Sequence, residues 1–258
     1  MLHEIQYDTL IALANSVPGT GKTKKNVVDT LTCCLRFAKK AKRIPEMPEA
    51  PEKSLYKIRK PAIVWLPSDR QEAVIRTIPK EHQPIFWFLK YHLRRPGEAI
   101  ALRKEDYDPG LDCFIMRRGI SANKEIERTK TGEEVMVPCV STFKPIMKSM
   151  PPTFSPYMFT WSGSHTEGQR YTHKVLRRIW DEACAELGED ITLYSGTKRS
   201  TASQLMNEKG LSRSELQEAG SWASIQSTEA YASANLALKR DLLERKVISI
   251  SEKRKKAK

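Results

Sequence analysis

The sequence predicts a mainly α-helical protein with a small antiparallel β-sheet. Apolar side chains recur at three- and four-residue spacing in residues 27–38 and in residues 176–187, which places them on one face of a helix. Residues 113–116 and 135–137 are short runs of strand-forming residues, and residues 131–132, Thr-Gly, are a plausible turn before the second run. The larger, carboxyl-terminal part of the chain therefore combines several helices with a few short strands.

Prolines divide the chain of 258 residues. Five of them fall in residues 45–67, and repeated proline blocks both helix and central strand, so this segment is expected to run extended as a linker between two bodies. Residues 1–44 precede it as a helical pair that is too small to bury much core alone. Residues 68–247 are expected to form one compact domain, followed by a basic tail at residues 248–258.

Positive charge is concentrated at the two ends of the chain. Lys and Arg number 44 against 31 Asp and Glu, which gives a net charge of +13. Residues 1–60 carry +6 and residues 251–258 carry +4, so the long segment between them holds only +3. This distribution indicates a nucleic-acid partner held by flanking segments, although basic tails also aid solubility. Charge alone leaves both interpretations open.

Composition excludes several other classes of protein. No apolar run reaches the ~18 residues that a membrane span needs, and residues 1–8 lack the basic head and apolar stretch of a secretory signal. An odd number of cysteines without a C-x-x-C pair argues against a disulfide framework or a cysteine-rich zinc module, and for a reducing cytoplasm. These cysteines are Cys33, Cys34, Cys113, Cys139 and Cys184.

Residues 16–23, Ser-Val-Pro-Gly-Thr-Gly-Lys-Thr, resemble the phosphate-binding loop of ATPases. Ser16 stands where that pattern has its first glycine, and residues 9–14 are helix-compatible rather than a clear buried strand. A Pro-Gly turn followed by a helix N-terminus explains the segment better, with its lysines facing solvent or DNA. A nucleotide-driven motor is the alternative.

Two short motifs, far apart in the sequence, carry the chemistry. The first is residues 95–98, Arg-Pro-Gly-Glu. The second lies in residues 220–231 and places Tyr231 nine residues after Trp222. Together they resemble the tyrosine recombinase (phage integrase) family, which has an R-x-x-E arginine and a nucleophilic tyrosine nine residues after a His or Trp. The resemblance extends, in the family's order, over most of residues 68–245.

The resemblance implies a role for each of these residues. Tyr231 would attack a DNA phosphodiester as the nucleophile, and Arg95 would clamp the phosphate with its charged, planar fork. Lys130, in the segment of residues 128–133 before a strand, resembles the family's hairpin lysine and would protonate the leaving 5′ hydroxyl. Trp222 would donate its indole N–H to a phosphate oxygen or pack beneath the site. The resemblance implies neither a metal nor ATP, because the 3′-phosphotyrosyl bond conserves the phosphodiester energy.

The second arginine box departs from the family's usual H-x-x-R. Alignment by the helix that contains Ala202 places Lys198 at the arginine position and Ser195 at the histidine position. Counting back from Tyr231 selects Arg199 instead. We favour Lys198, because helix register fixes side-chain direction, and expect Arg199 to reach the same phosphate. A lysine lacks the bidentate fork, so weaker transition-state stabilisation is predicted.

The resemblance also implies double-stranded DNA as the partner. Residues 20–50 resemble the end of the family's helical core-binding domain, which forms one jaw of a clamp around DNA. Residues 1–44 are therefore expected to be a partial core-binding domain, either naturally short or truncated. Its candidate DNA-binding residues lie mostly outside the apolar stripe: Lys22, Lys24, Lys25, Lys39 and Lys40.

The segment after Tyr231 is amphipathic over residues 234–246, with leucines four and seven positions apart. In the family such a tail helix can dock on a neighbouring subunit, and we expect the same here, in a homotetramer on DNA that accessory DNA-bending proteins assist. Packing within its own subunit is an equal alternative.

The sequence therefore predicts a site-specific recombinase or integrase of a mobile element, acting on nucleoid DNA in the cytoplasm. A type IB topoisomerase-like relaxing enzyme shares this chemistry, and a DNA-binding protein with impaired catalysis shares the binding features. Taken singly, each candidate residue has an ordinary structural explanation. Their joint occurrence at the family's spacing favours catalysis.

Overall fold

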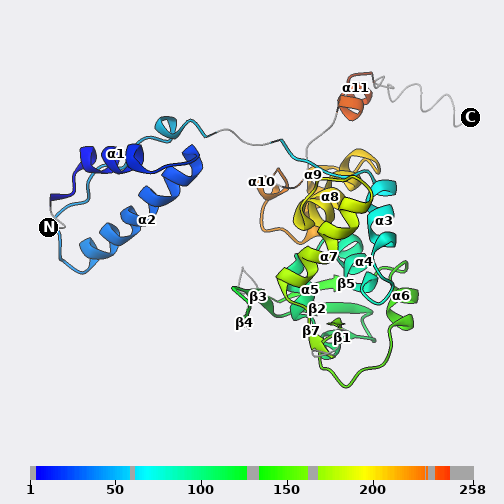
Figure 1. The fold of residues 1–258 in the computed structure, drawn as a ribbon. Coiled ribbons are helices and arrows are strands. Elements are labelled where there is room, and N and C mark those ends of the chain that lie inside the picture. Colours follow the sequence, from blue (N-terminus) through cyan, green and yellow to red (C-terminus); the bar gives the residue numbers. More distant parts are fainter. Residues whose placement is uncertain are drawn as a thin grey trace, which may run out of the picture. The chain divides into compact units, whose positions relative to one another are not determined.

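The computed structural model describes residues 4–58, 62–126, 134–161, 168–229, 231 and 236–244 (Figure 1). The chain divides into two compact units, residues 1–62 and residues 63–258. Each unit has its own buried hydrophobic clusters. No helix in the described ranges is long and apolar enough to cross a membrane. The fold class is confirmed, since helices dominate both units and the strands form small antiparallel sheets.

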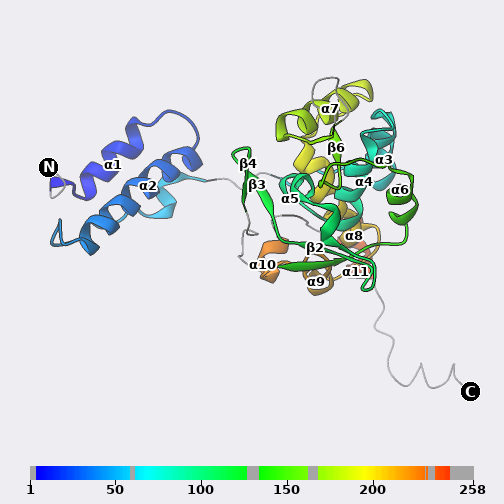
Figure 2. The ribbon, with the colours of Figure 1, turned by 90° about the horizontal axis from the view of Figure 1, so that it is seen from below.

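The first unit is a helical pair, α1 (Tyr7–Ser16) and α2 (Gly21–Lys40), which lie side by side in Figure 2. The Thr20 side chain caps α2 by accepting a hydrogen bond from the backbone N–H of Thr23. The apolar stripe predicted over residues 27–38 is confirmed in part, because α2 buries Val28, Leu35 and Ala38, whereas Val27 stays exposed.

A short 3-10 helix, η2 (Lys53–Tyr56), interrupts the run that the prolines predict to be extended. Tyr56 is only 5% exposed, because it packs with residues of α1 and α2 in one cluster. A Cβ atom on Gly21 would lie 1.7 Å from the Tyr56 carbonyl oxygen, so close approach of η2 requires a glycine there. Gly19 has φ +106° in the turn before α2. Close packing and backbone conformation thus explain the two glycines of the phosphate-loop-like segment.

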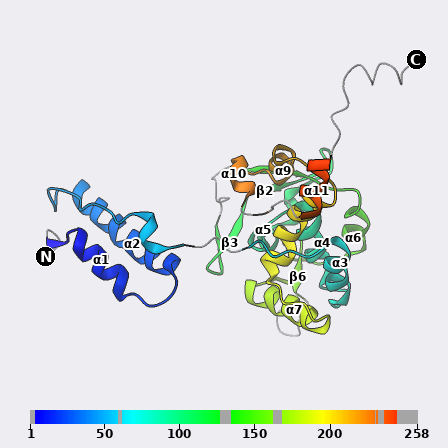
Figure 3. The ribbon, with the colours of Figure 1, turned by 90° about the horizontal axis from the view of Figure 1, so that it is seen from above.

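Helices are the main secondary structure in the described part of the second unit. They are α3 (Ser68–Thr77), α4 (Gln83–His92), α5 (Pro96–Ala101), η3 (Lys104–Asp106), α6 (Lys144–Ser149), α7 (His173–Glu186), the π-helical turn η4 (Ser195–Arg199), α8 (Ser200–Asn207), α9 (Arg213–Gly220), α10 (Ile225–Thr228) and α11 (Leu236–Glu244). Helices α9 and α10 lie side by side, as do α3 and α4 (Figure 3). The helix predicted over residues 176–187 is confirmed as the greater part of α7.

Within the described ranges, three small antiparallel sheets accompany the helices. The largest has the order β1-β2-β5, made of β1 (Tyr107–Asp108), β2 (Cys113–Met116) and β5 (Val135–Pro138). The other two are the hairpins β3 (Gly119–Ser121) with β4 (Lys124–Ile126), and β6 (Thr160–Trp161) with β7 (Gln169–Arg170). The two predicted strands are confirmed as the neighbours β2 and β5, while the predicted turn at residues 131–132 lies outside the described residues.

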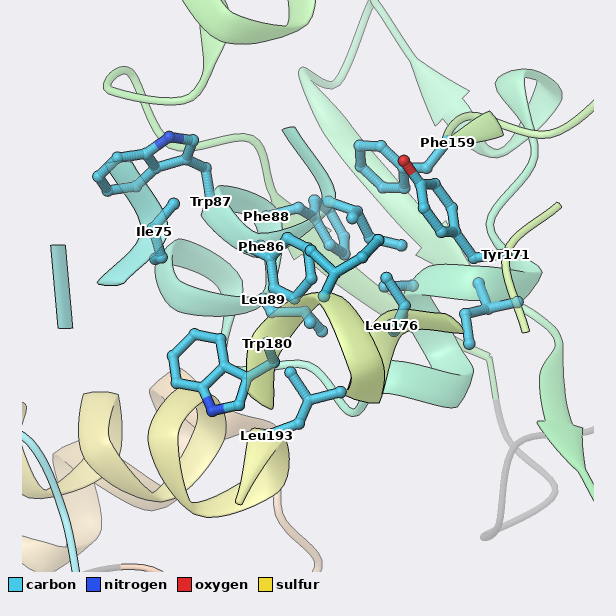
Figure 4. Close-up of a cluster of buried hydrophobic side chains, with 14 of the residues drawn as sticks. Ile75, Phe86, Trp87, Phe88, Leu89, Phe159, Tyr171, Leu176, Trp180 and Leu193 are labelled. Atoms are coloured by element: carbon cyan, nitrogen blue, oxygen red, sulfur yellow. The ribbon is translucent and has the colours of Figure 1, made fainter. Parts of the chain in front are cut away.

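Aromatic side chains of α4 form the centre of the main core (Figure 4). Phe86 stacks on Trp180 of α7 at 6.0 Å, and Phe88 meets Phe114 of β2 edge to face at 5.2 Å. Burying each such ring contributes about 1.5–3 kcal/mol, and aromatic pairing adds to it. The indole N–H of Trp180 donates to the Ile191 carbonyl at 2.9 Å, which ties α7 to the segment that enters η4. The core therefore fixes both α5, directly after α4, and η4.

Candidate active site

Arg95 caps α5 and is held there by Glu98. The Glu98 carboxylate accepts one hydrogen bond from the Arg95 backbone N–H and another from its guanidinium Nη1, both at 2.8 Å. Burial alone would raise the pKa of the Glu98 carboxyl, but the cations of Lys198, Arg94 and Arg95 hold it below its usual range. The guanidinium thus keeps a fixed direction with one side committed to Glu98.

The glycine inside the same motif has a packing reason. A Cβ atom on Gly97 would lie 2.7 Å from the Ile120 carbonyl oxygen and 3.1 Å from the His173 ring. Only a residue without a side chain lets α5 approach strand β3 this closely. The R-x-x-E spacing and its glycine together set the position of Arg95.

Tyr231 lies directly against Arg95. The Arg95 Nη2 donates a hydrogen bond of 3.1 Å to the Tyr231 hydroxyl oxygen, across 136 positions of sequence. The Tyr231 ring stacks on Trp222 with centroids 4.3 Å apart, and Tyr231 is 9% exposed. Both rings belong to a cluster with apolar residues of α8 and α9. The nucleophile candidate is therefore held by an arginine at its oxygen and by an indole at its face.

Trp222 lies beneath the tyrosine, which is one of the two placements that the sequence suggested. A Cβ atom on Gly220 would come within 2.4 Å of its ring, so the end of α9 closes tightly on the indole. The indole Nε1 is buried, and no described residue accepts its hydrogen bond. A buried donor without a partner is uncommon in folded proteins.

The turn η4 brings Lys198 to the same place. Lys198 is 1% exposed, and its Nζ lies 4.9 Å from the centroid of the Tyr231 ring and 5.4 Å from that of Trp222. Burial lowers the pKa of Lys198 to about 7; Glu98 opposes this shift, while Arg95 adds to it. Cations this close to aromatic faces are stabilised by the ring quadrupoles.

Arg199 turns to a different neighbour. Its guanidinium carbon lies 5.5 Å from the ring centroid of Tyr194, and its buried Nε has no hydrogen-bond partner in the described part of the chain. Tyr194 in turn lies 6.4 Å from Tyr231, centroid to centroid. Lys198 and Arg199 therefore both border the tyrosine pair, with Lys198 on Tyr231 and Arg199 on Tyr194.

Two residues that the sequence reasoning missed complete the site. Burial and hydrogen bonding to Tyr231 raise the pKa of the Tyr194 phenol. Arg94 is buried and donates to the carbonyls of His92 at 2.6 Å and Gly220 at 2.8 Å, so it joins the end of α4 to the end of α9. In the sequence, Tyr194 could have been found as the aromatic residue beside Ser195, and Arg94 as the arginine directly before Arg95.

The remaining candidates belong to the first unit or fall outside the described residues. Lys130 falls outside the described residues. The five lysine candidates of the first unit are all on α2, where Lys22, Lys39 and Lys40 are exposed, Lys24 is half-buried, and Lys25 pairs with Asp29. Within the described ranges, no group of three His, Cys, Asp or Glu residues is arranged to hold a metal ion.

A cavity of about 810 Å³ opens beside Arg95. It is lined by Arg95, Arg118, Arg177 and His173, by the Glu98 carboxylate, and by apolar side chains such as Ile120. Tyr194 also borders it. Each of the three arginines in this lining is paired with a carboxylate in the structure.

A mainly helical domain that gathers an arginine, a lysine and a tryptophan around one tyrosine side chain is the arrangement of the tyrosine recombinase class. The chain belongs to the phage integrase family, whose family model matches residues 65–237. No curated protein sequence is significantly similar to it.

Solved structures of similar fold include the Tn1549 transposon integrase in complex with circular intermediate DNA. It has a TM-score of 0.69 at 15% identity, over 95% of this chain and 87% of that chain. A lambda integrase dimer bound to a COC′ core site has a TM-score of 0.68 at 14% identity, over 96% and 85%. XerH site-specific recombinase bound to palindromic difH substrate, a post-cleavage complex, has 0.66 at 16% identity, over 94% and 70%. At these identities the likeness establishes the fold.

Proposed function

We propose that this protein is a site-specific DNA recombinase that cuts and rejoins DNA through a covalent bond between Tyr231 and a 3′ phosphate. The observation that carries the proposal is the hydrogen bond from Arg95 to the Tyr231 hydroxyl, because it joins the two motif residues at one point. Family membership supports the same reaction. So do the similar folds of an integrase and a recombinase bound to DNA.

The proposed reaction is an in-line displacement at a phosphodiester. The Tyr231 hydroxyl gives its proton to solvent water and its oxygen bonds to phosphorus, while the bond from phosphorus to the 5′ oxygen breaks. Arg95 donates to the non-bridging oxygens, whose negative charge grows in the transition state. Lys130 delivers the proton that the leaving 5′ hydroxyl takes up. Reversal of these steps with a different 5′ hydroxyl completes strand exchange.

Lys198 is the proposed second clamp on the phosphate. Its Nζ faces Tyr231, whereas Arg199 faces Tyr194 and serves as an auxiliary cation. A lysine acts as a point charge, so it stabilises the phosphate without fixing its orientation. An arriving phosphate restores the protonated form, because a nearby opposite charge raises the pKa of an amine.

The partner in this proposal is double-stranded DNA in the nucleoid. Exposed lysines of α2 bind its backbone through phosphate contacts. Four copies assemble on paired sites, with accessory DNA-bending proteins as helpers. Two leucines of α11 bear on the two expected roles of this helix. Leu238 packs against the Tyr231 cluster, which supports packing within the same subunit. Leu243 is exposed, which supports docking on a neighbouring subunit.

A nicked suicide substrate tests this function. Once cleavage releases a short 5′ fragment, religation stops, so wild type should accumulate a protein–DNA adduct visible on a denaturing gel. The Tyr231→Phe variant should bind the same DNA and form no adduct. An adduct of equal yield with Tyr231→Phe would refute the assignment. Recombination of a two-site plasmid, rather than relaxation of a one-site supercoil, would separate a recombinase from a topoisomerase.

A further inference from the structure

The π-helical turn that carries Lys198 is bound from behind by one buried glutamine. Gln71 of α3 is 0% exposed, and its Nε2 donates to the carbonyl oxygens of Gly196 at 2.8 Å and Thr197 at 3.2 Å. The same nitrogen lies 3.2 Å from the Thr201 hydroxyl at the start of α8. A π-helical turn departs from the regular hydrogen-bond ladder. The Ser200 backbone N–H donates to the carbonyls of Ser195 and Thr197, and Gln71 adds a side-chain donor at the carbonyls of Gly196 and Thr197.

The glutamine itself is held by a buried cation. Lys90 of α4 is 5% exposed, and its Nζ donates to the Gln71 Oε1 at 2.8 Å and to the Ser68 hydroxyl at 3.1 Å. Gln204 donates to the same Oε1 at 3.0 Å. With Oε1 occupied by donors, the Nε2 must face the turn. The Glu72 carboxylate, 3.5 Å away, supplies the opposite charge that a buried ammonium needs.

The opposite side of the turn is equally constrained. A Cβ atom on Gly196 would lie 2.2 Å from the Trp180 ring, so that ring presses directly on the turn. Lys198 follows one residue after Thr197 and sends its side chain to Tyr231. The Lys198 side chain is buried against the Tyr231 and Trp222 rings, so it has little room to compensate for a shift of its backbone.

We propose that Gln71, anchored by Lys90, is a positioning residue that sets Lys198 against Tyr231. The inference rests on the proposed function, since it takes Lys198 as a phosphate clamp. It predicts that an ordinary buried polar contact between α3 and η4 controls the rate of DNA cleavage, although Gln71 touches no reacting atom. A displacement of about 1 Å at a catalytic group costs on the order of 10²-fold in rate.

The sharpest variant is Gln71→Glu. It keeps the shape and the oxygen that faces Lys90, but it replaces the donor that faces the two carbonyls with a second acceptor. We expect adduct formation at saturating DNA to slow by about 10- to 100-fold, while the Kd for DNA stays within about twofold, because α2 and Arg95 are untouched. Gln71→Asn, which withdraws the same amide by one carbon, should give a smaller loss and serves if Gln71→Glu fails to fold.

A matched control is available in the same unit. Gln83 also donates from Nε2 to two backbone carbonyls, those of Ile78 at 2.7 Å and Arg76 at 3.2 Å, and its Oε1 accepts from Trp87. Gln83→Glu removes the same kind of contact away from η4. Because Gln83 is only half-buried, this variant should lower the Tm by no more than Gln71→Glu does, and it should leave the cleavage rate unchanged.

A double-mutant cycle tests whether Gln71 acts on cleavage through Lys198. In a Lys198→Ala background, Gln71→Glu should slow cleavage no further, because the residue it positions is gone. Equal slowing in both backgrounds, or equal slowing by Gln83→Glu, would overturn the inference. A wild-type protein that forms no adduct would instead overturn the proposed function, so the two failures are distinguishable.

Discussion

The two cations beside Tyr231 are held in opposite ways. Arg95 is a helix cap whose side chain is 36% exposed, and a carboxylate three residues away fixes its guanidinium. Lys198 is buried in a π-helical turn, and a glutamine behind its backbone and aromatic rings at its side chain surround it. The first cation is secured by local charge pairing, and the second by packing of distant elements. The position of Arg95 therefore depends on a few neighbouring residues, whereas the position of Lys198 depends on the packing of the whole core.

The comparison also concerns charge. Burial would lower the pKa of Arg95, but Glu98 outweighs it and the pKa is raised, so Arg95 is cationic at every working pH. Burial lowers the pKa of Lys198 to about 7, so its charge depends on conditions and on the ligand. The pair combines a permanent cation with a conditional one.

The largest expected effect is at the permanent cation. Arg95→Ala should reduce the rate of adduct formation by about 10³-fold, because it removes a charged donor both from the phosphate and from the Tyr231 hydroxyl. Arg95→Lys should recover only part of this loss, since it restores the charge without the fork. Single-turnover cleavage of the suicide substrate measures both. A rate within tenfold of wild type in Arg95→Ala would contradict the proposed role.

The pH dependence tests the conditional cation. Because the pKa of Lys198 is lowered to about 7, the free protein carries this charge below pH 7 and loses it above. Cleavage at subsaturating DNA, which reports the free protein, should therefore fall by about tenfold per pH unit above pH ~7. Lys198→Arg should remove this fall, because arginine stays protonated. An identical alkaline fall in both proteins would show that another group titrates.

Exposed Lys148 on α6 provides the control for this pH series. Lys148→Arg makes the same chemical exchange away from the site, so its profile should match that of wild type. A profile altered by Lys148→Arg would mean that the exchange itself, rather than its place beside Tyr231, changes the response.

The smallest effects concern the glycines beside each cation. Gly196→Ala would drive a Cβ atom into the Trp180 ring and should cost about 2–3 kcal/mol of stability; Gly97→Ala meets the Ile120 carbonyl at 2.7 Å and should cost about 1–2 kcal/mol. Gly119→Ala has nothing within 4 Å and is the matched control. Urea unfolding compares the three, and an unchanged midpoint in Gly196→Ala would refute the tight contact behind Lys198.

Local sequence was sufficient for much of this molecule. Periodicity predicted the helices that became α2 and α7, and strand-forming residues predicted β2 and β5, because these patterns reflect burial within one element. The prediction of an extended linker missed η2, because the spacing of prolines does not show that Tyr56 packs against α1 and α2. The assignments of Lys130 and of the three boundaries between the four predicted segments stay predictions.

The sequence by itself determined the class of fold, the Arg95 motif and the spacing of Trp222 from Tyr231, because each depends on residues within a few turns of one another. Only the tertiary structure placed Lys198 on Tyr231 and Arg199 on Tyr194, and only it revealed Gln71, Lys90 and Tyr194 around them. The physical reason is that a one-residue change of register around a widened helical turn redirects a side chain completely. The packing of Trp180 and α3 against that turn, which no local pattern encodes, selects the register.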